Sequence, residues 1–388
     1  MMKKINNSEI VSFIREIYNT SSNEIVSLHE PRFISDEKEL LNNCIDSTYV
    51  STVGKYVSEF EKILQDFTGA KHAISTSNGT SALHVSILAA DIQPKDEIIT
   101  QAFTFVATCN AIKYSLAEPV FVDISKNTLG MCPKSLLNWL HNNAEEKNGS
   151  FFNKNSGSKI SAVMPMHTFG HPCEIKEISD ICKEYKLALI EDTAEALGSY
   201  YENKHLGTFG DVGTLSFNGN KIITTGGGGA VITNDDKLAN KIRHLSTTAR
   251  LKTKYTFDHD EVGYNYRMPN LNASLGIAQM KKIKYFIDTK REVASTYKEF
   301  FDNSNIHFYD EPNNAKSNFW LNVLIFENAL LRDEALEYTN KNNIITRPPW
   351  KLMTKLKMFS DCEKSEITNS EDLESRILNI PSSVPLKN

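Results

Sequence analysis

The stretch LSFNGNKIITTGGGGAVITND, residues 215–235, sets one lysine, Lys221, between a short apolar run and four consecutive glycines. A lysine beside glycines suggests a nucleotide-binding P-loop, but that motif places its glycines before a Lys-Ser/Thr pair, and here the order is reversed. Because glycine has no Cβ, the run lets the backbone pass close to a bound group or to another chain segment. The alternative interpretation is a surface lysine ahead of a flexible hairpin, and this stretch alone leaves both open.

Around this stretch, short apolar runs alternate with longer helical patterns. HAIST, DEIITQ, EPVFVDI, ISAVMPMHT, LALIEDTA, VGTLSF and GAVITND are the apolar runs. Their alternation with helices predicts an α/β fold with a mostly parallel sheet. From about residue 270 longer helical patterns dominate, which indicates a smaller α+β domain. We therefore expect an N-terminal helical extension over 1–28, packed outside a large domain over 29–269, and a small C-terminal domain over 270–388.

Composition narrows the function classes. The formal charge of −5 and the lack of a basic run argue against a nucleic-acid partner. No apolar run reaches the roughly 18 residues of a membrane span, and the first residues lack the apolar core of a signal peptide, so we expect a cytoplasmic protein without a membrane partner. The six cysteines have neither C-x-x-C nor zinc-ligand spacing, which predicts reduced, packed thiols and no metal site. Residues 145–160 are rich in Asn, Ser, Lys and Gly and predict an exposed insertion.

Polar residues stand where predicted strands end. Gly79, Thr80 and Ser81 lie between a strand and a helix, where free N–H groups and the helix dipole favour a phosphate, although the same residues also suit an ordinary turn and cap. Asp192 ends another strand, and a carboxylate there can hold a protonated ring nitrogen or cap the next helix. In an open α/β sheet such strand ends surround the ligand crevice.

Three further side chains complete the pattern. Phe105 could stack on a flat cofactor or belong to the core, while Ser216 and Lys221 supply a hydroxyl for a phosphate and an amine for an aldehyde. A phosphate cradle, a ring acid, a stacking aromatic and an amine together describe one ligand, pyridoxal 5′-phosphate.

The order of motifs SNGTSAL, TFVATCNAI, PMHTFGHP, IEDTAEALGS, GTFGDVGTLSFNGNKIITTGGGGAV, GYNYRMPNLNASLGIAQ and TRPPW resembles a known family. From about His29 to the end, the chain is similar to the pyridoxal-phosphate-dependent sugar aminotransferases of the DegT/DnrJ/EryC1/StrS group. The resemblance implies the type I fold of these enzymes, with a large domain and a smaller C-terminal one. It also implies that Lys221 is the Schiff-base lysine and not a surface lysine ahead of a hairpin.

The resemblance implies roles for other residues of the cofactor site. Asp192 matches the acid on the pyridine nitrogen, and Glu195 matches a catalytic position near the cofactor's O3′ side. The matched cofactor-binding residues are Gly79, Thr80, Ser81, Phe105, Asp192, Ser216, Lys221 and Asn265.

Other matched positions concern the partner subunit and the substrate. Asn265 matches an asparagine that reaches the phosphate in the neighbouring subunit, which implies a homodimer with shared active sites. His167, Arg267 and Arg347 fall in motifs near the substrate, although a cap or a surface ion pair would explain each about equally well. Related chains often carry a histidine shortly after TRPPW, where this one has KLMTKLKMF.

By resemblance, the amino donor is L-glutamate and the acceptor is a nucleotide-linked keto sugar. The sequence looks most like the LegC-type branch, which aminates C4 of a UDP-linked 4-keto-6-deoxy-N-acetylhexosamine for bacillosamine or legionaminic acid synthesis. A GDP-perosamine synthase is the alternative, because Glu195 fits that group as well. A deoxysugar dehydratase would have histidine at Lys221, and a cofactor-binding regulator would need an added DNA-binding segment.

Overall fold

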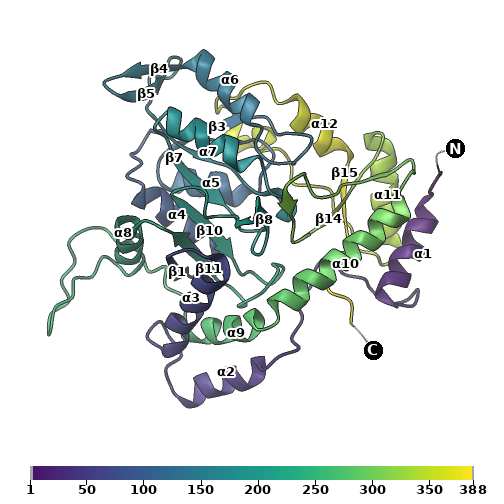
Figure 1. Cartoon of the computed structure of the whole chain (residues 1–388), viewed down its shortest axis with the longest axis horizontal. Helices are drawn as coiled ribbons and strands as arrows, with labels where there is room; N and C mark the ends of the chain where they lie inside the picture. Colours follow the sequence, from purple (N-terminus) through teal and green to yellow (C-terminus); the bar gives the residue numbers. More distant parts are fainter. Residues whose placement is uncertain (1–2, 387–388) are drawn as a thin grey trace.

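The computed structural model describes residues 3–386, and a seven-stranded sheet forms its centre (Figure 1). In spatial order the strands are β1 (His72–Thr76), β11 (Gly229–Thr233), β10 (Val212–Ser216), β7 (Ala188–Asp192), β6 (Ile160–Met164), β2 (Glu97–Gln101) and β3 (Glu118–Val122). β11 runs antiparallel to β1 and β10, and the other neighbouring pairs are parallel. The predicted α/β fold with a mostly parallel sheet is therefore confirmed.

Helices cover both faces of this sheet. Adjacent residues of one strand enter different cores, as Ile98 and Ile99 of β2 do, because successive side chains point to opposite faces. One face packs on α4 (Gly79–Ala89), α5 (Val106–Tyr114) and α8 (Asp236–Ser246). The other packs on α6 (Pro133–Asn143) and α7 (Ile175–Glu184). The βα connections place the carboxyl ends of the parallel strands along one edge.

The C-terminal part carries a second, smaller sheet. Its strands are β12 (His307–Phe308), β14 (Asn322–Ile325) and β15 (Ile377–Ile380), and its helices are α10 (Ile283–Phe301), α11 (Ala329–Lys341) and α12 (Thr368–Arg376). The apolar stretch NFWLNVLIF, residues 318–326, is only partly a strand, because residues 318–321 lie before β14. Short 3₁₀ turns, η2 (Met353–Lys355) and η3 (Lys357–Phe359), follow α11.

The N-terminal helix α1 (Asn7–Tyr18) begins with a capping box at Asn6 and Glu9. Its apolar face, which includes Ile10 and Ile14, joins a core formed by α10, α11, β14 and β15. The expected packing outside the large domain is wrong, and Figure 1 shows α1 beside α11.

The predicted boundary at residue 270 coincides with the start of α9 (Asn270–Met280). This helix packs against α2 (Glu37–Asp46) and α3 (Lys55–Thr68), and α3 also contacts β1 of the large sheet. α9 therefore connects the two parts, and the division at 270 stays a prediction.

Residues 145–160 contain most of a two-stranded hairpin, β4 (Ala144–Lys147) and β5 (Ser150–Asn153). The hairpin is not wholly exposed as expected. Asn153 is fully buried, and its Nδ2 donates to carboxylate oxygens of Glu97 and Glu363 at 2.8 and 2.7 Å. A further small sheet joins β13 (Ala315–Lys316) to β8 (Tyr200–Tyr201) and β9 (Lys204–His205), which links the two parts again.

Within residues 3–386, no helix combines the length and apolar character needed to cross a bilayer. All six cysteines are free thiols, four of them buried and two half-buried, as the sequence predicted.

Candidate active site

A cavity of about 290 Å³ lies at the carboxyl edge of the large sheet. Its walls come from segments that follow β1, β2, β7 and β10, and from two tryptophans of the C-terminal part. The structure brings seven of the predicted site residues to these walls: Gly79, Thr80, Phe105, Asp192, Glu195, Ser216 and Lys221.

The first turn of α4 forms one wall of the cavity. Its N-cap is Asn78, whose Oδ1 accepts the N–H of Ser81 at 2.7 Å, and Gly79 and Thr80 face the cavity. A Cβ on Gly79 would lie 2.9 Å from the Cβ of Ser216, so only glycine allows this approach. Because free N–H groups and the helix dipole meet here, the turn and Ser216 form a cradle suited to a phosphate.

Asp192 ends β7 and is almost fully buried. Its Oδ2 accepts the hydroxyl of Thr108 at 2.7 Å, and its Oδ1 accepts the N–H of Ala194 at 3.2 Å. Burial raises the pKa of this carboxyl, while these hydrogen bonds and the charge of Lys221 act in the opposite direction. A buried carboxylate that already has two donors is well placed to meet one cationic nitrogen in the cavity.

Lys221 extends from the loop between β10 and β11. Its Nζ donates to Glu195 Oε1 at 3.2 Å and lies 4.0 Å from the centre of the Trp320 ring. Glu195 Oε2 accepts the N–H of Phe169 at 2.9 Å. Burial raises the pKa of Glu195 to about 7, although Lys221 and Phe169 lower it. The pair therefore places an amine and a carboxyl that titrates near neutrality side by side.

The glycines after Lys221 allow a close backbone approach. A Cβ on Gly229 would lie 2.5 Å from the carbonyl carbon of Asn78, at the start of α4. The glycine run thus brings β11 against the helix end that cradles the phosphate site. The sequence prediction of close approach to another chain segment is confirmed.

Aromatic rings form the remaining wall. Phe105 is the N-cap residue of α5, is 44% exposed and faces the cavity. Its ring centre lies 5.9 Å from that of Trp350, which also packs at 4.9 Å against Phe169. A flat group in the cavity would meet Phe105 on one side.

His167 does not line the cavity, which corrects the expected substrate contact. The side chain is fully buried, with Nε2 3.1 Å from Glu191 Oε2, and its Nδ1 accepts the N–H of Cys173. The backbone N–H of His167 donates to the backbone carbonyl of Asp192 at 3.1 Å. His167 therefore supports the end of β7 from behind.

Four other predicted residues also lie outside the cavity walls. The Ser81 hydroxyl is 3.1 Å from that of Ser77 and is buried behind the turn. Arg347 is exposed and donates to Asn340 Oδ1 and to the carbonyl of Thr346, so it faces α11 and not the cavity. Arg267 Nη2 donates to Oδ1 of the exposed Asn265 at 3.4 Å, and neither residue lines the cavity, although the backbone of Arg267 pairs with Thr76, just before the Asn78 cap.

Sequence reasoning missed several wall residues. Trp320 lies in the apolar stretch NFWLNVLIF, which is typical of a strand, and Trp350 ends the motif TRPPW, in which only Arg347 is predicted to contact the substrate. Thr108, three residues after Phe105, gave no signal of its contact with Asp192. Tryptophan is rare in this chain, which has three, and this rarity is the feature of the sequence that could have drawn attention to Trp320 and Trp350.

One group of possible metal ligands occurs among residues 3–386. The half-buried His244 of α8 and the exposed Asp260 and Glu261 of the following loop bring ligand atoms together. An ion pair between His244 Nε2 and Asp260 Oδ1 at 2.6 Å accounts for the arrangement.

The chain is similar to known proteins in sequence and in structure. The model of the DegT/DnrJ/EryC1/StrS aminotransferase family matches residues 31–388. The chain is 36% identical to a GDP-perosamine synthase of Escherichia coli O157:H7, over 94% of each chain. It is 36% identical to a UDP-4-amino-4,6-dideoxy-N-acetyl-beta-L-altrosamine transaminase of Campylobacter jejuni, over 67% of this chain and 65% of that one. The structure of Helicobacter pylori PseC, an aminotransferase of pseudaminic acid biosynthesis, superposes with a TM-score of 0.83 at 26% identity, over 92% and 94% of the chains.

The chain belongs to the DegT/DnrJ/EryC1/StrS aminotransferase family. The predicted type I fold and enzyme class, a pyridoxal-phosphate-dependent aminotransferase, are thereby confirmed, as is the cofactor. The match from residue 31 also agrees with the expected start of the resemblance near His29.

Proposed function

We propose that this enzyme transfers an amino group from L-glutamate to C4 of a nucleotide-linked 4-keto-6-deoxy sugar. The observation that carries the proposal is the half-buried Lys221, whose amine lies 3.2 Å from Glu195 in one cavity with Asp192 and a helix end suited to a phosphate. Relatives named for amino-sugar synthesis support a sugar as the acceptor.

The cavity residues fit pyridoxal 5′-phosphate. The first turn of α4 and Ser216 would hold the phosphate, Asp192 the ring nitrogen, and Phe105 one face of the ring. Lys221 would hold the aldehyde carbon covalently. When bound, the cofactor supplies an electron sink for removal of a proton from the amino donor.

The chain's own residues can move that proton. The amine of Lys221, once free, is the base nearest to the ring site, and Glu195 accepts its hydrogen bond. A carboxyl whose pKa lies near 7 can take up and return a proton near neutral pH. Asp192 needs only to stay ionised, because its task is to keep a ring nitrogen protonated.

The nucleotide is the finer part of the proposal. The LegC-type resemblance favours a UDP-linked 2-acetamido-2,6-dideoxy-4-keto-hexose, for bacillosamine or legionaminic acid type glycans. The relationship to a GDP-perosamine synthase across nearly the whole chain favours a GDP-linked sugar as the second candidate. Incubation with glutamate and a panel of UDP- and GDP-linked 4-keto sugars, followed by mass analysis, tests both. Amination of neither class would overturn the sugar assignment.

The rival functions predict different behaviour. A dehydratase with this fold would need histidine in place of Lys221. A regulator would bind the cofactor but ignore amino donors. Under our proposal, glutamate alone changes the absorbance of the bound cofactor. One molecule of 2-oxoglutarate then appears for each cofactor that has reacted. A cofactor spectrum indifferent to glutamate would favour the regulator.

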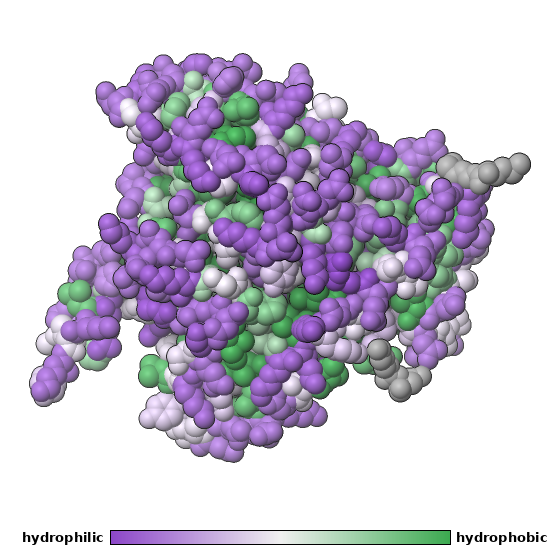
Figure 2. Space-filling model, viewed as in Figure 1, coloured by the Kyte–Doolittle hydropathy of each residue, from purple (hydrophilic) through white to green (hydrophobic). Residues whose placement is uncertain are grey.

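We also propose a homodimer with shared active sites. Apolar side chains are exposed beside α2, including Phe33 at 57%, Tyr49 at 62% and Val53 at 68%. Figure 2 shows hydrophobic residues gathered on the same lower part of the molecule. The loop after α8 projects from the body in Figure 1, and it exposes Tyr255 and Val262 shortly before Asn265. Such surfaces are typical of subunit interfaces.

The shared site has a direct test. Mixing Lys221→Ala subunits with Asn265→Ala subunits should give heterodimers with one repaired site and a partial return of activity. No recovery, with mixed dimers verified by mass, would argue against sharing.

We also propose that the protein works in the cytoplasm, a reducing compartment in which its free thiols would stay reduced.

A further inference from the structure

The segment Ser317–Trp320 reaches from the C-terminal part into the cavity, and Trp320 lies against the lysine. The indole is 4% exposed, and the Lys221 amine lies 4.0 Å from the ring centre. A cation over an aromatic face is attracted by the ring's electron density. The amine thus has two neighbours that favour it in one place, the Glu195 carboxyl and this ring.

Trp320 is fixed by every polar group that it carries. Its backbone N–H donates to Asn318 Oδ1 at 2.8 Å, and its carbonyl accepts the Nζ of Lys290 at 3.2 Å. Its indole N–H donates to the carbonyl of Asn220 at 2.6 Å, and Asn220 directly precedes Lys221. The tryptophan therefore holds both the side chain and the backbone of the lysine loop.

Asn318 ties the same segment to the other side of the pair. Its Nδ2 donates to the carbonyls of Glu195 and Leu197 at 2.9 and 3.0 Å, and its own N–H donates to Ser199 Oγ. Room for this amide is kept by Gly170, where a Cβ would lie 1.9 Å from Asn318 Oδ1 and φ is +93°. One side chain thus joins the Glu195 turn to Trp320.

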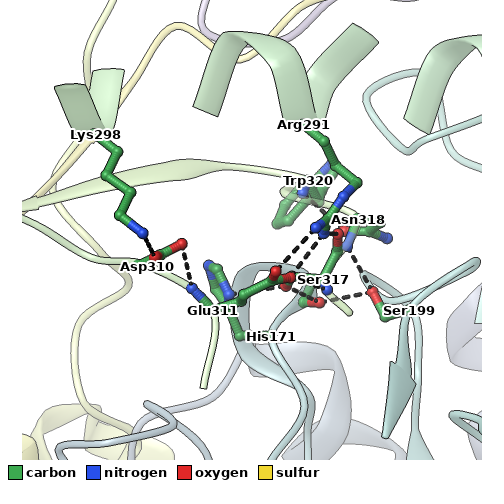
Figure 3. A network of polar contacts seen from close by, with 10 residues as sticks. His171, Ser199, Arg291, Lys298, Asp310, Glu311, Ser317, Asn318 and Trp320 are labelled. Carbon is green, nitrogen blue, oxygen red and sulfur yellow. Dashed lines mark hydrogen bonds and ion pairs between the residues drawn. The ribbon is translucent and has the colours of Figure 1, made fainter. Parts of the chain in front are cut away.

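An ion pair anchors the segment to α10, as Figure 3 shows. Arg291 donates to both oxygens of Glu311 at 2.7 and 2.9 Å and to the carbonyl of Ser317 at 2.7 Å. The Ser317 N–H donates to Glu311 Oε2, and its hydroxyl donates to the Gly170 carbonyl. A bidentate pair of this kind has little freedom to reorient, so the segment has a rigid base.

We propose that Trp320 is a positioning residue for Lys221, and that Asn318 holds it in register with Glu195. The inference rests on the proposed function, because it gives the lysine amine a fixed direction toward the cofactor. It also accounts for Lys290, whose amine is buried against the Trp320 carbonyl and outside the cavity walls.

The test compares Trp320→Leu, which removes the ring face and the indole N–H, with Trp320→Phe, which keeps a ring face. Trp139→Leu is the control, because Trp139 is equally buried but lies on α6, outside the cavity. Two labels at Lys221 are measured by peptide mapping. The first is covalent pyridoxal phosphate after borohydride reduction, and the second is reductive methylation by formaldehyde in protein without cofactor.

We expect Trp320→Leu to slow the first label about tenfold, because a misdirected amine meets a fixed aldehyde less often. The same change should speed the second label about threefold, since the cation is no longer held on the ring. Trp320→Phe and the control should both stay within about twofold of the parent protein in both measurements. Parent-like rates in Trp320→Leu would overturn the proposal.

The two ideas can fail separately. If the parent protein never carries pyridoxal phosphate at Lys221, the proposed function fails, while the formaldehyde label still reports on the ring. If Trp320→Leu does not fold, fluorescence decides. Lys221→Met should then change the Trp320 emission, measured as the difference from the same change in a Trp320→Phe background. An unchanged emission would overturn the proposal.

Discussion

Glu191 and Glu195 stand four residues apart in the chain, and each carboxylate pairs with a basic side chain. The two pairs differ in what surrounds them. Glu191 and His167 are 3.1 Å apart with both side chains fully buried. Glu195 and Lys221 are 3.2 Å apart, and the lysine keeps 12% of its side chain exposed. The first pair is sealed behind the sheet edge, and the second lines the cavity.

The number of backbone donors separates the pairs. Glu191 accepts the N–H groups of Gly207, Phe209 and Gly210 at 2.7 to 2.8 Å, so its charge is satisfied inside the fold. Glu195 accepts one N–H, from Phe169, and depends on Lys221 for the rest. A fully satisfied carboxylate supports structure, whereas one with a single backbone donor remains responsive to a proton or a ligand.

Lys221→Ala should have the largest effect, because it removes the only group of the second pair that can bond to an aldehyde. We expect turnover to fall below detection, while pyridoxal phosphate still binds without a covalent bond. Glutamate-dependent formation of 2-oxoglutarate and dialysis of the cofactor measure the two parts. Near-parental turnover would remove Lys221 from its role.

Asp192→Asn changes the residue that directly follows Glu191 and precedes Glu195 in the sequence. A neutral amide cannot keep a ring nitrogen protonated, so we expect kcat to fall by roughly 10²–10³-fold, the usual loss for one preorganised electrostatic partner. Single-turnover kinetics with glutamate would measure it, with thermal unfolding to verify the fold. Unchanged kinetics would mean that another acid serves the ring.

Glu191→Gln tests the sealed pair. An amide NH₂ would face N–H donors that the second oxygen now satisfies, and we expect a loss of about 3 kcal/mol in the free energy of unfolding. The protein that remains folded should keep most of its activity. Chemical denaturation with and without cofactor measures this, and a stable but inactive variant would contradict the distinction between the pairs.

Glu195→Gln tests the pH response of the second pair. Burial raises the pKa of Glu195 from 4.5 to about 7, so the folded state binds this proton more tightly than the unfolded chain. The resulting stability is fully present below pH 4.5 and is lost as the pH rises to about 7. Relative to the glutamine variant, the parent protein without cofactor should lose about 3 kcal/mol across that window. Parallel stability curves would contradict the shift.

Arg347→Ala should have the smallest effect. The side chain is exposed and donates to Asn340 and to the carbonyl of Thr346, outside both pairs and the cavity. We expect a stability change below about 1 kcal/mol and kcat/KM within about twofold. A tenfold rise in KM for the sugar would restore Arg347 as a substrate contact.

The sequence predicted the sheet and the cavity residues that follow its strands, because period-two apolar runs and strand-end polar groups are local signals. Lys221, Asp192 and Gly79 were found this way. His167 is predicted near the substrate, but the structure buries it outside the cavity walls, since motif position does not reveal on which side of a strand end a side chain lies. Trp320 was missed because its contact with Lys221 joins residues about a hundred positions apart. The packing of α1 was missed for the same reason.

The placement of α1 has a consequence for how the chain is made. Its apolar residues Ile10 and Ile14 pack on Tyr297 and Leu378, and the Tyr18 hydroxyl donates to the carbonyl of Ser383. Tyr18 and Ser383 stand 365 positions apart, so α1 is synthesised long before the segment that completes its contacts. Until those residues have been made, the apolar face of α1 stays exposed and accessible to chaperones.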